Sequence, residues 1–115
     1  MTKKTIAKAF SVGEFEKVFE FIAENAVWEV IEENTFQGKK AIVDNCKQVA
    51  NYFETVTTRF DILNVISEDN RVAVNGTAEF LRNGKRISFV SACDLYEFDD
   101  QYQIKKITSY CIQAK

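Results

Sequence analysis

The amino-acid sequence predicts a single α+β domain in which three N-terminal helices pack on a strongly curved, mainly antiparallel sheet. Helical periodicity dominates the first half of the chain, and after Thr55 four long runs rich in β-branched and aromatic residues follow one another. Helices followed by a meander of strands indicate α+β rather than alternating βαβ units. The 115 residues fit one domain, spanning 1–115.

Three segments of the first half have helical spacing. Residues 3–10 form a short helical candidate. Ser11-Val12-Gly13-Glu14 has the form of a capping box, so a second helix is expected to open there and run to about Asn25. The third helix follows Gly38, because apolar residues recur at three- and four-residue steps as far as Phe53.

The strand candidates are rich in Val, Ile, Phe, Tyr and Thr and are bounded by turn residues. The four runs after Thr55 are about twice the usual ~5–6 residues, so we expect a coiled sheet with bulges. Two shorter strands are expected between the second and third helices. The predicted ranges are 27–32, 35–37, 57–67, 71–82, 85–98 and 102–113.

The turns suggest a register for the last strands. If Asp100-Gln101 is the tip of the final hairpin, Asp94 lies opposite Ile107, and one face of the sheet carries Val90, Ala92, Asp94, Ile107, Ser109 and Cys111. If Asn83-Gly84 is the tip of the preceding hairpin, as its preference for a type I′ turn suggests, then Phe80 faces Ile87 and Ala78 faces Phe89.

These two registers place Asp94 on the face opposite to Phe80. A single bulge between Phe89 and Asp94 would reverse the alternation and bring Asp94 to the Phe80 face. The sequence does not locate a bulge, so the face of Asp94 stays open.

Composition excludes several classes of function. The chain has no His, which excludes Ser-His-Asp and Cys-His catalysis and every His-ligated metal site. With a net charge of −2 and no basic cluster, nucleic acid is not expected as a partner. No apolar run approaches the ~20 residues that span a bilayer, so no membrane partner is expected. Neither a metal nor a cofactor is predicted.

The three cysteines also indicate the cellular compartment. Cys46, Cys93 and Cys111 are odd in number and lack C-x-x-C spacing. This pattern argues against a disulfide framework and favours reduced thiols, and therefore a cytoplasmic location. Without a His to activate them, Cys93 and Cys111 are interpreted as packing residues.

Three stretches carry a family resemblance: 23–30 (AENAVWEV), 38–42 (GKKAI) and 93–98 (CDLYEF). In this order and spacing they resemble the nuclear transport factor 2-like superfamily, and more narrowly its SnoaL-like and ketosteroid-isomerase-like branch. The resemblance covers nearly the whole chain. It implies a cone that opens at one end around a small apolar pocket, and a homodimer formed through the sheet.

The resemblance transfers only one of three functional positions of ketosteroid isomerases. The second oxyanion-hole acid of those enzymes matches Asp94. Their general-base Asp falls at about Val30 and their oxyanion-hole Tyr at about Ile6, neither of which can do that chemistry. Steroid isomerisation is therefore not expected, and the superfold alone does not define a function.

Two acids are catalytic candidates. Asp94 lies in a largely apolar run, and burial would raise the pKa of its carboxyl so that it could donate a proton or a hydrogen bond at neutral pH; the buried acid of ketosteroid isomerase donates such a hydrogen bond. Glu32 shares a strand face with Val30 and is the reachable carboxylate near the mouth of the cone. The structural alternatives are an ion-paired or solvent-facing Asp94 and a Glu32 in a solvated loop.

Six side chains are candidate ligand contacts, although aromatic residues at such spacings are also common core residues. The expected function is therefore binding of a small apolar or amphipathic ligand in the cone. One alternative is an acid-base enzyme of isomerase, dehydratase or cyclase type with Asp94 as proton donor, and another is a dimerisation module whose pocket is filled by its own side chains. The candidate contacts are Phe19, Trp28, Val30, Phe53, Tyr96 and Tyr110.

Overall fold

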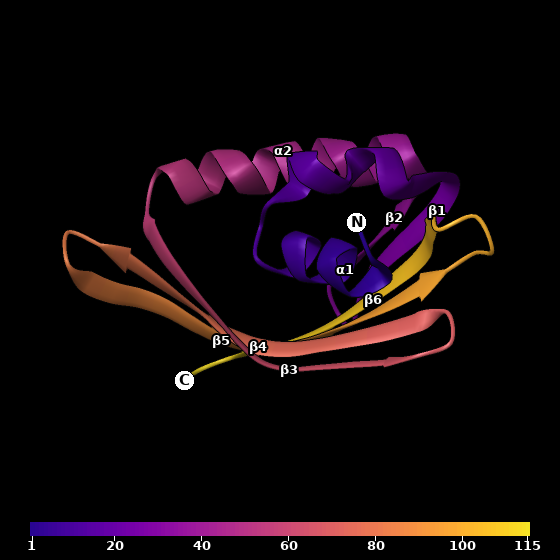
Figure 1. The fold of residues 1–115 in the computed structure, drawn as a ribbon. Helices are drawn as coiled ribbons and strands as arrows, with labels where there is room; N and C mark the ends of the chain where they lie inside the picture. The colour runs from indigo at the N-terminus through magenta and orange to yellow at the C-terminus, as the bar shows by residue number, and fades with distance from the viewer.

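The computed structural model describes residues 1–115 and confirms the predicted α+β class. Two α-helices and a 3-10 helix cover one face of a bent six-stranded sheet (Figure 1). The helices are α1 (Lys3–Ser11), η1 (Phe15–Phe21) and α2 (Lys39–Glu54). The strands are β1 (Ile22–Val30), β2 (Asn34–Gln37), β3 (Thr57–Glu68), β4 (Arg71–Arg82), β5 (Lys85–Phe98) and β6 (Ile104–Gln113).

The sheet is mixed but mostly antiparallel. Its strand order is β2-β1-β6-β5-β4-β3, and only the β1–β6 pair is parallel. The long β3, β4 and β5 bend beneath the helices, so the sheet is concave on the side that the helices cover (Figure 1). None of the helices has the length and apolar character needed to cross a membrane.

The core lies between the helices and the concave face of the sheet. Helix α1 begins where Thr2 caps it, with the Thr2 hydroxyl accepting the Thr5 N–H at 3.1 Å. The helix then buries Ile6, Ala7, Ala9 and Phe10 against the sheet, as its helical spacing predicts. The largest fully buried side chains opposite are those of Tyr96 and Phe98 on β5 and Ile104 and Ile107 on β6.

The predicted second helix is wrong in extent. Ser11 is the last residue of α1 rather than a cap, Gly13 adopts φ +82°, and only the short η1 follows. Gly13 also lies against the ring of Phe53, since an added Cβ would sit 2.8 Å from the ring. Neither the positive φ nor the close approach allows a continuous helix here, and Glu14 makes no side-chain cap.

Strand β1 begins five residues before its predicted start at Val27. Ile22, Ala23 and Ala26 are buried, a spacing that resembles one face of a helix. This spacing arises because β1 is irregular: Ile22 pairs with Ile104 and Val27 with Lys106, so the register shifts between them. The β1–β2 turn also starts earlier than predicted, and Glu32 lies in it with φ +66°.

The final hairpin has a longer loop than predicted. The Asp99 carboxylate accepts the backbone N–H groups of Gln101 and Gln103, and β6 starts only at Ile104. Asp94 therefore pairs with Ser109 instead of Ile107, a slip of two residues. Because side chains alternate with a period of two, this slip preserves the faces, and the predicted common face of 90, 92, 94, 107, 109 and 111 is confirmed.

A bulge at Ile87 decides the face of Asp94. Leu81 pairs with Arg86 but Phe80 pairs with Ser88, so Ile87 is the extra residue. The predicted Phe80–Ile87 and Ala78–Phe89 pairs are therefore wrong; Phe80 faces Ser88 and Ala78 faces Val90. The bulge lies next to the Asn83-Gly84 turn rather than between Phe89 and Asp94, and it places Asp94 on the Phe80 face.

A second bulge bends the other edge of the sheet. Ile62 pairs with Gly76 and Asn64 with Asn75, which leaves Leu63 unpaired. At this bend an added Cβ on Gly76 would lie 2.4 Å from the Asp61 carbonyl oxygen. Glycine at 76 therefore permits the close approach of β3 to β4.

Replacing Gly76 with Ala should destabilise the fold because the β3 backbone would have to move away. We expect Gly76→Ala to lower the free energy of unfolding in urea by about 2–3 kcal/mol. Gly84→Ala is the matched control, because a Cβ added there would have no atom within 4 Å and only the φ of +76° disfavours Ala. We expect this variant to lose about 1 kcal/mol of the free energy of unfolding. Equal losses in the two variants would contradict this account of the bend.

Candidate functional site

The space between the helices and the concave face of the sheet holds a cavity of about 560 Å³. Eighteen residues line it, twelve of them hydrophobic, and they come from α1, η1, α2 and four strands. Its volume falls in the range of small-molecule pockets. The alternative of a dimerisation module whose pocket is filled by its own side chains stays a prediction.

Aromatic side chains form much of the wall. The Phe10 and Trp28 rings meet edge to face with centroids 5.1 Å apart. The Phe53 ring stacks between Phe15, at 6.4 Å, and Phe80, at 5.8 Å. Contacts of this kind add to the burial of apolar area and hold the rings in defined positions. The wall is thus apolar and well ordered around the few polar groups that face it.

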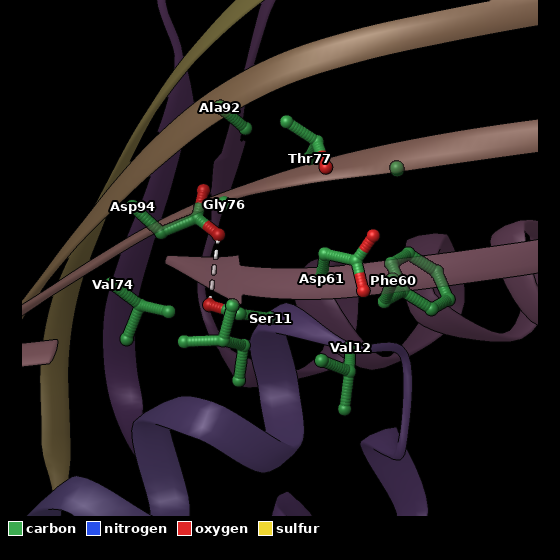
Figure 2. Close-up of a pocket in the computed structure, with 11 residues that line it drawn as sticks. Ser11, Val12, Phe60, Asp61, Val74, Gly76, Thr77, Ala92 and Asp94 are labelled. Atoms are coloured by element: carbon green, nitrogen blue, oxygen red, sulfur yellow. Dashed lines mark hydrogen bonds between the residues drawn. The ribbon is translucent and has the colours of Figure 1, made fainter. Parts of the chain in front are cut away.

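Asp94 on β5 and Glu33 in the β1–β2 turn are the two acids that line this cavity. The Asp94 carboxylate also lines a smaller cavity of about 50 Å³ beside the end of α1 (Figure 2). The Ser11 hydroxyl donates a hydrogen bond to Asp94 Oδ2 at 2.9 Å. The early end of α1, which the capping-box prediction missed, is what brings Ser11 to the acid.

The hydrogen bonds around Asp94 have a defined direction. Ser11 has one hydroxyl proton and donates it to Asp94, so Tyr96 must donate its own proton to Ser11 Oγ across 2.6 Å. On the other side the Trp28 indole N–H donates to Ser109 Oγ at 3.0 Å. Ser109 is the cross-strand neighbour of Asp94; because its Oγ accepts from Trp28, its own proton is free to point to the carboxylate, and it lowers the pKa of Asp94. One chain of donors thus ends on Asp94 through Ser11, and a second approaches it through Ser109.

Two opposing effects act on the pKa of Asp94. Burial raises it above the ordinary value because the charged form loses hydration. The hydrogen bonds from Ser109 and Ser11 lower the pKa, but the net direction is upward. Burial together with the Asp94 charge raises the pKa of Tyr96 well above its usual value, so its hydroxyl remains a donor.

The thiols are not activated. Burial raises the pKa of Cys46 to about 12, and burial with the nearby Asp94 and Glu33 charges raises that of Cys111 to about 11. Burial and Asp94 also raise the pKa of Cys93. Thiols with such pKa values are protonated at neutral pH and are poor nucleophiles.

The structure brings together only some of the predicted site residues. Trp28, Val30 and Phe53 line the large cavity with Asp94. Phe19 lies in a separate groove between η1 and α2, and Tyr110 is half exposed on β6, where its neighbours Ser109 and Cys111 are the residues that face the cavity.

Tyr96 and Glu32 have positions that the sequence did not indicate. Tyr96 is fully buried and does not line the cavity; its hydroxyl is hydrogen-bonded to Ser11, and the Asp94 charge raises its pKa. Glu32 is exposed in the β1–β2 turn, and its neighbour Glu33 lines the cavity instead. The prediction that Glu32 shares a strand face with Val30 is wrong because β1 ends at Val30.

Sequence reasoning missed five polar groups of the site, Ser11, Glu33, Asn45, Ser109 and Gln113. Ser109 was predicted on the face of Asp94 but was not considered as its donor. Elsewhere, the structure contains no group of three or more His, Cys, Asp or Glu side chains that could hold a metal ion.

Comparison with known proteins gives consistent matches. Residues 3–108 match the sequence model of the SnoaL-like domain family. A nuclear transport factor 2-like protein of unknown function from Cytophaga hutchinsonii is 32% identical, with 94% of each chain covered and a TM-score of 0.84. No curated protein matches the chain.

Two more distant structures share the fold. One is an LEH-like epoxide hydrolase from M. tuberculosis, 16% identical, covering 96% of this chain and 82% of the other with a TM-score of 0.72. The other is a SnoaL-like family protein from Agrobacterium tumefaciens, 14% identical, covering 97% and 99% with a TM-score of 0.73. At these identities the likeness concerns the fold.

Removing a hydroxyl donor should raise the pKa of Asp94 further, because the charged form loses a hydrogen bond. We expect carbon NMR titration of the Asp94 carboxyl to give a midpoint above the model-peptide ~3.9. The midpoint should rise again in Ser11→Ala, whereas Ser67→Ala, an exposed position on β3, should leave it unchanged.

The same pKa shift has a consequence for stability. The folded protein keeps the Asp94 proton to higher pH than the unfolded chain does. The contribution of Asp94 to the free energy of unfolding is therefore present below the pKa of the unfolded chain and is lost as pH rises through the pKa of the folded protein.

In the NMR titration, an Asp94 carboxyl midpoint that did not respond to Ser11→Ala would contradict the hydrogen bond from Ser11.

Proposed function

This chain belongs to the SnoaL-like domain family, and from that premise we propose that it binds one small, largely apolar molecule in the cavity of its cone. The family match agrees with the resemblance predicted from the sequence. The observation that carries the proposal is an ordered cavity of about 560 Å³ with twelve hydrophobic residues in its wall.

The cavity combines a large apolar area with few polar groups, which is the composition of small-molecule sites. Trp28, Phe53 and Phe80 offer rings to an apolar body, and Asp94 offers one hydrogen-bonding point at the floor. A ligand would thus gain affinity from apolar burial and orientation from the acid.

Filling the cavity should remove binding without unfolding the protein. Ala78 lines the wall, so we expect Ala78→Phe to weaken binding of 1-naphthol roughly tenfold or more. Isothermal titration calorimetry measures the change, and Gln48→Phe, at an exposed position on α2, is the matched control. Equal affinity in wild type and Ala78→Phe would contradict binding in this cavity.

The alternative function is acid-base catalysis with Asp94 as proton donor. Its support is the raised pKa of Asp94 in an enclosed site, a property that is common in catalytic acids. A proton on Asp94 would occupy an oxygen site that Ser11 and Ser109 leave free. The name of one distant fold relative, an epoxide hydrolase, is compatible with such chemistry.

A base for this alternative would come from Glu33 or a water rather than from Glu32, because Glu33 lines the cavity. Styrene oxide and cyclohex-3-enone, a small epoxide and an unconjugated ketone, are suitable test substrates. We expect Asp94→Asn to lower any turnover by roughly 10²-fold or more, and Asp44→Asn, exposed on α2, to leave it unchanged. Turnover that survives Asp94→Asn would exclude Asp94 as the acid.

We also propose that two copies pair through the convex face of the sheet. On this face Ile66, Tyr110 and Ile112 are 67%, 50% and 71% exposed, and all three helices lie on the other side. An uncovered apolar sheet face of this kind is typical of an interaction surface.

Light scattering during size-exclusion chromatography should give twice the chain mass of 13.2 kDa. Ile112→Lys should shift the mass towards the monomer, because it buries a charge at the interface. Gln48→Lys, on the opposite side of the molecule, should not change the mass. A wild-type monomer at micromolar concentration would contradict pairing.

A further inference from the structure

We propose that the ligand of this cavity is an organic cation, an apolar molecule with a protonated amine, and that Asp94 receives its ammonium group. This inference rests on the proposed binding function and specifies its ligand class. Four observations support it: the charges of the wall, the absence of cationic partners for its acids, the direction of its hydrogen bonds and the aromatic rings around it.

The wall of the cavity contains acids and no bases. Asp94 lies at its floor and Glu33 also lines it, whereas none of its eighteen residues is Lys or Arg. The smaller cavity beside Asp94 likewise has no basic residue, and its second acid, Asp61, is paired with Arg59 at 3.3 Å. A cleft lined by charges of one sign attracts ligands of the opposite sign.

The protein itself leaves both acids without a cationic partner. Its five salt bridges involve Glu14, Glu29, Asp44, Asp61 and Glu79, and neither Asp94 nor Glu33. Cys111, which also lines the cavity, feels both charges, since Asp94 and Glu33 each raise the pKa of its thiol. The two carboxylates thus act on the same part of the cavity.

The hydrogen bonds make the floor an acceptor. Tyr96 donates to Ser11, and Ser11 donates to Asp94 at 2.9 Å; Trp28 donates to Ser109, which leaves the Ser109 proton free to point to the neighbouring carboxylate. A carboxylate offers about four lone-pair sites, and these two serines use at most two. The remaining sites can accept from a ligand, and an ammonium group carries three donors. A ligand carboxylate or ketone would bring only acceptors to Asp94, so its donors would have to come from the amide groups of Asn45 and Gln113 elsewhere in the wall.

The aromatic rings favour a cation over a neutral donor. Phe10, Phe15, Trp28 and Phe53 surround the cavity, and ring faces attract ammonium groups. Folding has already removed hydration from Asp94, as its raised pKa indicates. The main further desolvation cost of binding an amine is therefore that of the ligand itself. A close ion pair with Asp94 and contacts with the aromatic rings offset this cost. An alcohol would make a hydrogen bond here but would leave the buried charge uncompensated.

The test uses two ligands of nearly equal shape, 1-naphthylmethylamine and 1-naphthalenemethanol, measured by calorimetry at neutral pH. We expect wild type to bind the amine about tenfold or more tightly than the alcohol. Asp94→Asn should abolish this preference while alcohol binding persists, and Glu33→Gln should reduce it by a smaller factor. Glu24→Gln, exposed on β1 and outside the cavity wall, should preserve it.

The outcomes separate this inference from the function on which it rests. Equal or tighter binding of the alcohol by wild type would overturn the amine preference and leave the proposed binding function in place. An amine preference that survived Asp94→Asn would also overturn the role given to Asp94. If neither compound bound at millimolar concentration, both the proposed function and the ligand class would fall.

Discussion

The bulge at Ile87 is the constraint on which the cavity depends. Side chains of a strand alternate between two faces, so one extra residue reverses the faces of everything beyond it. Without the bulge, β5 would present Asp94 to the convex face while β4 presented Phe80 to the concave one. With it, the acid and the aromatic ring line one cavity. A single inserted residue near a turn therefore decides whether the carboxyl group of Asp94 lies in the cavity.

Once Asp94 lies inside, the surrounding residues have to compensate its lost hydration. Ser11 at the end of α1 donates to it, and Ser109 on β6 lies beside it as its cross-strand neighbour and lowers its pKa. Each serine in turn accepts from a buried donor, Tyr96 or Trp28. The pKa nevertheless stays raised, so compensation is incomplete and the carboxylate can gain from a further donor or a cation. The same geometry supports both proposals made for the site.

Local signals predicted most of the fold. The periodicity of α1 and α2 and the Asn83-Gly84 turn appear in the structure because short-range sequence determines them. The predictions failed where tertiary contacts decide. Ser11 resembles a cap but bonds to Asp94, 83 positions away, and the buried spacing of 22–26 resembles a helix because β1 is irregular. Asp94 could be predicted as a candidate from its apolar neighbours. Predicting the sheet face on which it lies would have required the position of a bulge, and no local motif marks that position.

The central claim is that Asp94 is held at the cavity floor as the acceptor of two donor chains. The chain contains one Trp, so the Trp28 indole N–H gives a single proton NMR signal. Because the indole N–H donates to Ser109, and Ser109 is the cross-strand neighbour of Asp94, that signal should shift with pH at the midpoint of the Asp94 carboxyl carbon. An indole signal that stayed constant while Asp94 titrated would contradict the account.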